Sequence, residues 1–187
     1  MSRVPAGSAQ TRLIVLRGNS ASGKSTAAAQ IRRCDGRGIA IVGQDNLRRV
    51  VLRERDVPCG VNVGLIDTVA RYALGHGYHV ILEGILYAAH YGGMLDALRT
   101  DHHGRTWFYY LDIPFEETLR RHAGKPQAGE YGHAEMSSWY REHDVLPGGY
   151  EQIIGEHATL DAIVQQVMND TGLTREQTLP RQQAQPH

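Results

Sequence analysis

The chain has 187 residues, of which 41% are hydrophobic and 21% are charged. This composition is ordinary for a soluble globular protein, and the length allows one α/β domain with a substantial buried core. Twenty basic residues balance twenty acidic ones, so the formal net charge is zero. A balanced charge argues against a long nucleic acid as a partner, because binding one takes many phosphate contacts from a positive surface.

The sequence predicts neither a membrane span nor a disulfide framework. No apolar run approaches the roughly 18 residues that a membrane span needs, and residues 1–11 lack the apolar core of a signal peptide. Two cysteines, Cys34 and Cys59, are too few for a disulfide framework and suggest a reducing compartment. We therefore expect a cytoplasmic protein that does not contact a membrane.

The first predicted strand leads into a glycine-rich loop. An apolar run over residues 13–16 approaches Gly18, and the Walker A spacing G-x-x-x-x-G-K-S then opens a helical pattern over about residues 24–34. Glycines at both ends of the loop let successive backbone N–H groups turn inward around a phosphate. Lys24 reaches the outer phosphates, the Ser25 hydroxyl can bind Mg²⁺, and the start of the helix adds a positive end.

This loop predicts a site for a nucleoside triphosphate. The alternative is a Gly/Ser-rich turn that binds no ligand, but the strand before the loop and the helix after it favour the nucleotide site. The residues expected to bind the nucleotide are Gly18, Asn19, Ser20, Ala21, Ser22, Gly23, Lys24, Ser25 and Thr26.

The later elements are predicted in turn from apolar runs and helical spacings. In the helix expected after Asp45, Leu47, Val50 and Val51 should form the inner face. Further strands are expected at residues 39–42, 78–84, 106–112 and 151–155, and further helices at about 63–74, 87–100, 114–122, 139–143 and 159–169.

The ends and one internal segment have a different composition. Residues 124–133 are polar and rich in glycine, so we expect a lid at about 124–143. Residues 1–11 should be a flexible arm, and the Gln-, Arg- and Pro-rich residues 173–187 a disordered tail. The domain itself should span residues 12–172.

The alternation of strands and helices predicts an α/β fold. We expect a mainly parallel five-stranded sheet with helices on both faces and a lid, and the Walker A spacing at Gly18 adds the P-loop of an NTPase to this sheet. Ligands of such sheets bind beyond the carboxyl ends of the strands. The Gly18 loop, Asp45, Glu83 and Asp112 lie at or just past such ends. They should therefore meet on one rim, although Asp112 precedes Pro114 and fits a helix start better.

Asp45 is the candidate for catalysis at the acceptor. A carboxylate within hydrogen-bond reach of a hydroxyl can orient it and take its proton during phosphoryl transfer. Arg48, three residues later, should share a helix face with Asp45 and could grip the acceptor. The alternative is that Asp45 only caps a helix and that Arg48 is a solvated surface residue.

Glu83 ends the third predicted strand, where a carboxylate can hold Mg²⁺ through water and help to bind the substrate. The alternative to a functional role is that Glu83 is only a polar strand end that faces solvent.

Arg120 and Arg121 precede the predicted lid, where cations can neutralise the transferred phosphoryl group. Their alternative is a favourable interaction with the C-terminal end of a helix.

Three stretches together resemble the P-loop kinases. These are Gly18–Thr26, Gln44-Asp45 and Val80–Leu86, and they are similar to runs in the uridine kinase and phosphoribulokinase group. The pair Asp45 and Arg48 also resembles polynucleotide kinases and zeta-type toxin kinases, and the chain length resembles chloramphenicol phosphotransferases. The D-H-P segment of uridine kinases is absent, because Asp56-Val57-Pro58 stands here.

The resemblance implies a kinase that uses ATP and Mg²⁺. It implies that Asp45 is the acceptor base and that Ser25 binds the metal. It also implies that Arg120 and Arg121 are lid cations, which would make them catalytic together with Lys24.

Three functions remain open after this resemblance. The first is a kinase of a small molecule such as a nucleoside, a sugar or a nucleoside-like antibiotic. The second is a kinase of a nucleotide sugar or of a nucleic-acid 5′ end. The third is a nucleotide-binding regulatory protein without transfer. The zero net charge favours a small-molecule acceptor over nucleic acid. A homodimer is an open alternative to a monomer.

Overall fold

Five parallel strands form the centre of the protein. The computed structural model describes residues 6–124, 129 and 131–173. The strands stand in the order β2-β3-β1-β4-β5, and every neighbouring pair is parallel. They are β1 (Arg12–Gly18), β2 (Ile39–Gly43), β3 (His79–Gly84), β4 (Arg105–Asp112) and β5 (Glu151–Gly155). The predicted parallel five-stranded α/β fold is confirmed.

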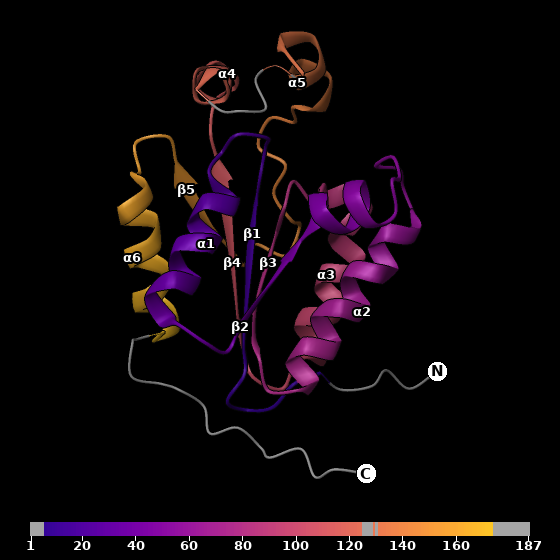
Figure 1. Cartoon of the computed structure of the whole chain (residues 1–187), viewed down its shortest axis with the longest axis vertical. Helices are drawn as coiled ribbons and strands as arrows, with labels where there is room; N and C mark the ends of the chain where they lie inside the picture. Colours follow the sequence, from indigo (N-terminus) through magenta and orange to yellow (C-terminus); the bar gives the residue numbers. More distant parts are fainter. Residues whose placement is uncertain (1–5, 125–128, 130, 174–187) are drawn as a thin grey trace.

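Two pairs of helices cover the two faces of this sheet (Figure 1). Helices α1 (Lys24–Asp35) and α6 (Leu160–Thr171) pack on one face, and α2 (Val61–Gly75) and α3 (Ala88–Asp101) pack on the other. Strand β1 is buried on both faces, because alternate residues point to opposite sides. Leu13 and Val15 join the cluster under α2 and α3, while Ile14 and Leu16 join the cluster under α1 and α6.

The segment after β2 differs from the prediction. Instead of an α-helix with an apolar inner face, it forms a short π-helical segment, η1 (Asn46–Val51), with no fully buried residue. Val50 and Val51 are 70% and 58% exposed, and only Leu47 packs against the core. The reason is that α2 already covers the apolar surface on this face of the sheet. The short η1 segment, which precedes α2, therefore has no apolar surface left to cover.

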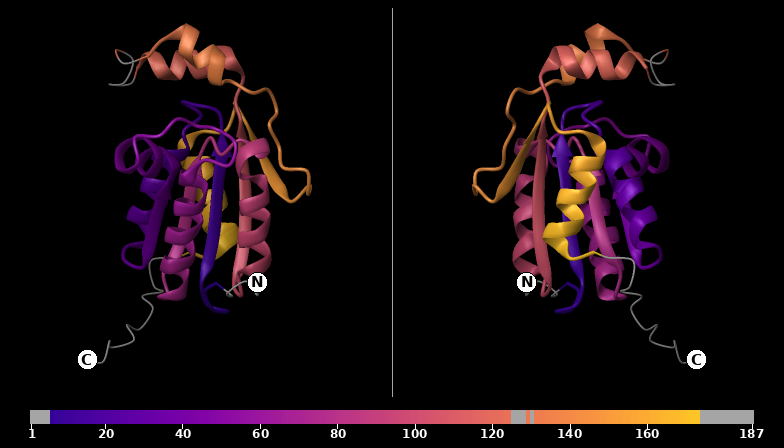
Figure 2. Two further views of the ribbon diagram at one scale, coloured as in Figure 1. Left: turned by 90° about the vertical axis from the view of Figure 1, so that its right-hand side faces the viewer. Right: turned by 90° about the vertical axis from the view of Figure 1, so that its left-hand side faces the viewer.

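Helices α4 (Phe115–Ala123) and α5 (His133–Trp139) lie together over the carboxyl ends of the strands (Figures 1 and 2). The predicted helix at 139–143 was wrong, because α5 ends at Trp139. The start of α5 has a local cause, because the Glu135 carboxylate accepts a hydrogen bond from the Gly132 N–H at 2.9 Å. The start of α6 also has a local cause, since the Thr159 hydroxyl accepts from the Ala162 N–H.

The expected flexible arm does not extend over residues 6–11. Ala6 is 2% exposed, and its N–H donates to the Asp101 carbonyl while its own carbonyl accepts from the His103 N–H. The Thr11 hydroxyl lies 3.0 Å from Nε2 of His102. Residues 1–5 of the expected arm and 174–187 of the expected tail lie outside the described residues. Within the described part of the chain, no helix has both the length and the apolar character that crossing a membrane requires.

Candidate active site

The phosphate loop connects β1 to α1 at the carboxyl edge of the sheet. Gly18 has φ +141°, and a Cβ at this position would lie 2.5 Å from the Leu111 carbonyl oxygen on β4. Gly23 has φ +106° and directly precedes α1. These backbone conformations favour glycine, so the glycine spacing follows from the shape of the loop. The loop therefore places its N–H groups and a helix N-terminus at one point, as an anion site requires.

Lys24 lies folded over this loop. Its side chain is almost buried, and Nζ donates to the Asn19 carbonyl at 2.7 Å and to Oγ of Ser22 at 3.1 Å. The ammonium group thus lies above the loop, where outer phosphate oxygens could replace these contacts.

Ser25 and Glu83 meet beside the loop. Oγ of Ser25 donates to Oε2 of Glu83 at 2.8 Å, because β3 lies next to β1 with Leu16 opposite Glu83. Burial raises the pKa of Glu83, and the nearby Lys24 charge opposes that shift. A hydroxyl and a carboxylate next to a phosphate loop suit Mg²⁺, which takes its remaining ligands from phosphates and water. Ser25 and Glu83 are therefore the residues that would hold this ion.

Asp45 and Arg48 form an exposed ion pair at the end of β2. Nη2 of Arg48 lies 3.1 Å from Oδ1 of Asp45, whose side chain is 65% exposed. Asp45 stands at the start of η1, but its side chain makes no capping hydrogen bond. A capping role is therefore not seen, and Arg48 is held rather than solvated, since Nη1 also donates to the Glu54 carbonyl at 3.2 Å.

The two arginines at the end of α4 have different environments. Arg121 donates from Nη1 to the Ser22 carbonyl at 3.2 Å and from Nη2 to the Glu156 carbonyl at 3.1 Å, so it contacts the phosphate loop. The Arg120 side chain is 76% exposed and pairs with Glu117 at 2.6 Å. Arg121 also pairs with Glu117, and of the two arginines it alone contacts the phosphate loop among the described residues. Their role as lid cations stays a prediction.

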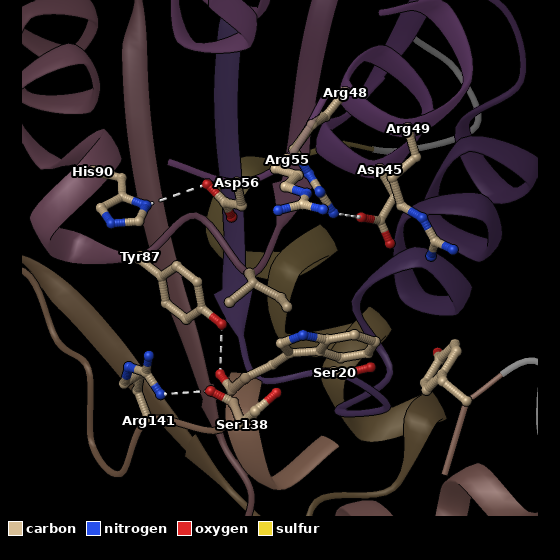
Figure 3. Close-up of a pocket in the computed structure, with 13 residues that line it drawn as sticks. Ser20, Asp45, Arg48, Arg49, Arg55, Asp56, Tyr87, His90, Ser138 and Arg141 are labelled. Atoms are coloured by element: carbon tan, nitrogen blue, oxygen red, sulfur yellow. Dashed lines mark hydrogen bonds and ion pairs between the residues drawn. The ribbon is translucent and has the colours of Figure 1, made fainter. Parts of the chain in front are cut away.

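A cavity of about 480 Å³ lies beside the phosphate loop (Figure 3). It lies between η1, the start of α3 and the α5 segment, a name we use for α5 together with its flanking residues, 131–141. Thirteen residues line it: Ser20, Asp45, Arg48, Arg49, Arg55, Asp56, Ile85, Tyr87, His90, Tyr131, Ser138, Trp139 and Arg141. The structure thus brings Asp45, Arg48 and one loop residue, Ser20, to a common cavity.

The sequence did not single out several of these residues. Arg49 and Arg55 follow the predicted pair Asp45 and Arg48 in sequence, and their shared charge was an available signal. Arg141 had no such signal, because it lies far along the chain from the loop that it contacts. Its N–H donates to Oδ1 of Asn19 at 2.9 Å, and Nδ2 of Asn19 donates to the Arg141 carbonyl at 2.7 Å. This two-way contact ties the end of the α5 segment to the phosphate loop.

Asp56 is held in place by three neighbours rather than by an arginine. Oδ2 accepts from Nε2 of Gln44 at 3.0 Å, and Oδ1 accepts from the Tyr91 hydroxyl at 2.9 Å. Nδ1 of His90 lies 3.2 Å from Oδ1. Gln44 itself is buried, and its Oε1 accepts from the Leu86 N–H at 3.0 Å. The Gln44-Asp45 run therefore has two roles: Gln44 fixes the cavity wall and Asp45 faces the cavity.

Comparisons with known proteins point to one fold. Neither a family model nor a curated protein matches the chain. Among solved structures, the Mycobacterium tuberculosis APS kinase CysC, in complex with AMPPNP and APS, is similar with a TM-score of 0.61 and 22% identity over 88% of this chain and 97% of that chain. A gluconokinase from Sinorhizobium meliloti 1021 gives a TM-score of 0.59 and 17% identity over 91% and 94%. The Deinococcus radiodurans tunicamycin resistance protein gives 0.58 and 16% over 88% and 97%.

Proposed function

We propose, from the P-loop kinase fold of this chain, that the protein is a phosphotransferase that uses ATP and Mg²⁺. It moves the γ-phosphoryl group to a hydroxyl of a small molecule such as a nucleoside, a sugar or a nucleoside-like antibiotic. The observation that carries the proposal is a carboxylate, Asp45, in the wall of the cavity that Ser20 of the phosphate loop also lines. A donor site and a proton acceptor thus share one space, which phosphoryl transfer to an alcohol requires.

The residues divide into donor and acceptor roles. Loop N–H groups and Lys24 hold the phosphates of ATP, and Arg121 adds a cation beside Ser22. Bound Mg²⁺ supplies positive charge that neutralises the developing charge on the phosphates, and Ser25 and Glu83 would hold it. On the other side of the loop, Asp45 faces the acceptor, and its ion pair with Arg48 restricts its orientation.

The reaction balances without a further reactant. The acceptor oxygen forms a bond to the γ-phosphorus while the bond from that phosphorus to the β,γ-bridging oxygen breaks. The proton of the acceptor hydroxyl passes to the Asp45 carboxylate, and ADP leaves with the electron pair of the broken bond. The α5 segment covers this edge of the sheet, which would limit the access of water (Figure 2).

The decisive test is Asp45→Asn. Because the Asp45 side chain is exposed and makes no helix cap, asparagine should leave the melting temperature and ATP affinity unchanged while removing the base. We expect transfer to an acceptor from a pool of nucleosides, sugars and antibiotics, each offered in neutral and anionic forms, to fall by about 10²–10⁴-fold. The measurement is radiolabelled product from labelled ATP, with ATP binding and melting recorded on the same sample.

Lys24→Ala is the matched comparison, since it should weaken ATP binding itself. Full turnover in Asp45→Asn would show that Asp45 is not the base. Normal ATP binding without any transfer by the wild-type protein would support a nucleotide-binding protein instead of a kinase.

A further inference from the structure

Four arginines line the cavity beside the phosphate loop: Arg48, Arg49, Arg55 and Arg141. Figure 3 shows the first three on one side of the cavity and Arg141 on the opposite side. They come from η1, from the segment that follows it and from the end of the α5 segment, so none of them belongs to the phosphate loop. The nucleotide phosphates already have Lys24, Arg121 and the loop N–H groups, so the cavity arginines that have no carboxylate partner are available for another ligand.

Most of this positive charge is not neutralised by the protein. Among the residues that the structure describes, the side chains of Arg49 and Arg55 make no hydrogen bond or ion pair. Arg141 donates from Nη1 to the carbonyls of Ser138 and Tyr140, at 3.0 and 2.8 Å, which are neutral acceptors. Within the part of the chain that the structure describes, three guanidinium groups thus face one cavity without a carboxylate partner.

The two carboxylates of the cavity have partners other than Arg49, Arg55 and Arg141. Asp45 pairs with Arg48, and Asp56 is held by Gln44, Tyr91 and His90. Even Arg48 keeps one unused donor, because its Nε is buried and has no hydrogen-bond partner among the described residues. Like charges that face one cavity repel each other, and an oxyanion that accepts several N–H donors relieves that repulsion.

We infer, on the basis of the proposed kinase activity, that the acceptor is a small molecule that carries an oxyanion group besides its hydroxyl. A phosphate, sulfate or carboxylate bound by Arg49, Arg55 and Arg141 would place the hydroxyl toward Asp45 and the loop. Arginine is suited to this, since its planar donors match these groups in two-point contacts. The cavity volume of about 480 Å³ fits a small ligand, and the zero net charge of the chain disfavours a nucleic-acid chain.

The first test measures anion binding without catalysis. Inorganic sulfate is titrated calorimetrically into protein saturated with Mg²⁺ and a non-hydrolysable ATP analogue, so that the β- and γ-phosphate positions of the phosphate loop are already filled. The variant is Arg49→Gln with Arg55→Gln, and the control is Arg32→Gln with Arg33→Gln at the exposed end of α1. Both double variants lose two positive charges, so only the cavity differs. We expect about tenfold weaker sulfate binding in the cavity variant and none of that loss in the control. No binding to the wild type, or equal binding to both variants, would overturn the inference.

The second test compares neutral acceptors with their phosphate monoesters, which keep the other hydroxyls of the parent compound. Labelled ATP is offered with adenosine or adenosine 5′-monophosphate, with glucose or glucose 6-phosphate, and with a 5′-hydroxyl oligonucleotide. We expect transfer to a charged small compound and not to its neutral partner. Better transfer to neutral compounds or to the oligonucleotide would refute the anionic small acceptor and leave the kinase standing. Sulfate binding in the cavity without transfer to any compound would count against the kinase and support the anion site.

Discussion

Glu83 combines two opposing demands at one residue. Glu83 is only 9% exposed, and this burial raises its pKa above the ordinary value of 4.5. A buried carboxylate is costly while it has no cation, but the same carboxylate is ready for Mg²⁺ when the nucleotide brings the ion. The Ser25 hydroxyl, at 2.8 Å, offsets part of this cost in the absence of ligand. Stability and function therefore compete at this position.

That competition makes Glu83→Gln informative. The folded protein binds this proton more tightly than the unfolded chain, so wild-type stability falls as the pH rises from 4.5 through the folded pKa. The Glu83→Gln variant has no carboxyl group at this position and therefore does not lose stability in this way. We expect it to melt higher than the wild type at pH 7 without ligand, with a difference that shrinks toward pH 4. Magnesium-dependent turnover should fall by about 10–100-fold. The melting curves need Asp161→Asn as a surface control, and a variant that melts lower at pH 7 would contradict the burial argument.

At the scale of elements, the strands and long helices followed from the sequence, whereas the cavity wall did not. The apolar runs of β1 and β3 are buried on both faces, so their pattern was unambiguous. The phosphate loop, Asp45 and Glu83 were placed by one rule, because parallel strands end on one edge, whereas Arg48 was placed by its spacing from Asp45. The path of η1 depends on what α2 covers, and Arg141 reaches the loop through a tertiary contact, so neither has a local signal in the sequence.

Glu54 connects η1 to α2 and thereby positions Arg55 and Asp56. Its carboxylate accepts from the Asn62 N–H at 2.9 Å and the Val61 N–H at 3.0 Å, at the start of α2. These hydrogen bonds lower the pKa of Glu54, and the bond from the Asn62 N–H has the largest effect. Their stabilisation is therefore present above pH 4.5 and is lost as the pH falls through the pKa of Glu54 in the folded protein. The carboxylate thus fixes the cavity wall as well as the helix.

We therefore expect Glu54→Ala to lower stability and also raise KM for the acceptor, with KM for ATP unchanged. Thr159→Ala is the matched cap variant, because Thr159 caps α6 away from the cavity. It should cost about 1 kcal/mol of unfolding free energy and leave both KM values unchanged. The two variants are compared by chemical unfolding and by steady-state kinetics. An equal effect of both on the acceptor KM would show that Glu54 acts only through global stability.

At the scale of the whole molecule, one buried arginine joins the edge of the sheet to the segment that returns from α5. The Arg17 side chain, at the end of β1, is 0% exposed and pairs with Glu151 of β5 at 2.8 Å and with Asp144 at 3.1 Å. Nε also donates to the Leu86 carbonyl, just past β3, at 2.9 Å. Arg17 therefore connects the end of β1 with the residues just past β3, with the start of β5 and with the segment that follows α5, next to the phosphate loop.

Arg17→Met should accordingly destabilise the entire domain. It leaves Glu151, whose side chain is 2% exposed, as an uncompensated buried charge, and the expected loss is about 3–5 kcal/mol of unfolding free energy. Because the loss arises from the unpaired carboxylate, adding Glu151→Gln to Arg17→Met should recover part of it. Urea unfolding of the single and double variants measures both effects, with Arg33→Met as an exposed control that should change stability by less than about 0.5 kcal/mol. If the double variant is less stable than Arg17→Met alone, the stabilisation comes from packing of the long side chain and from the Leu86 hydrogen bond rather than from the ion pair.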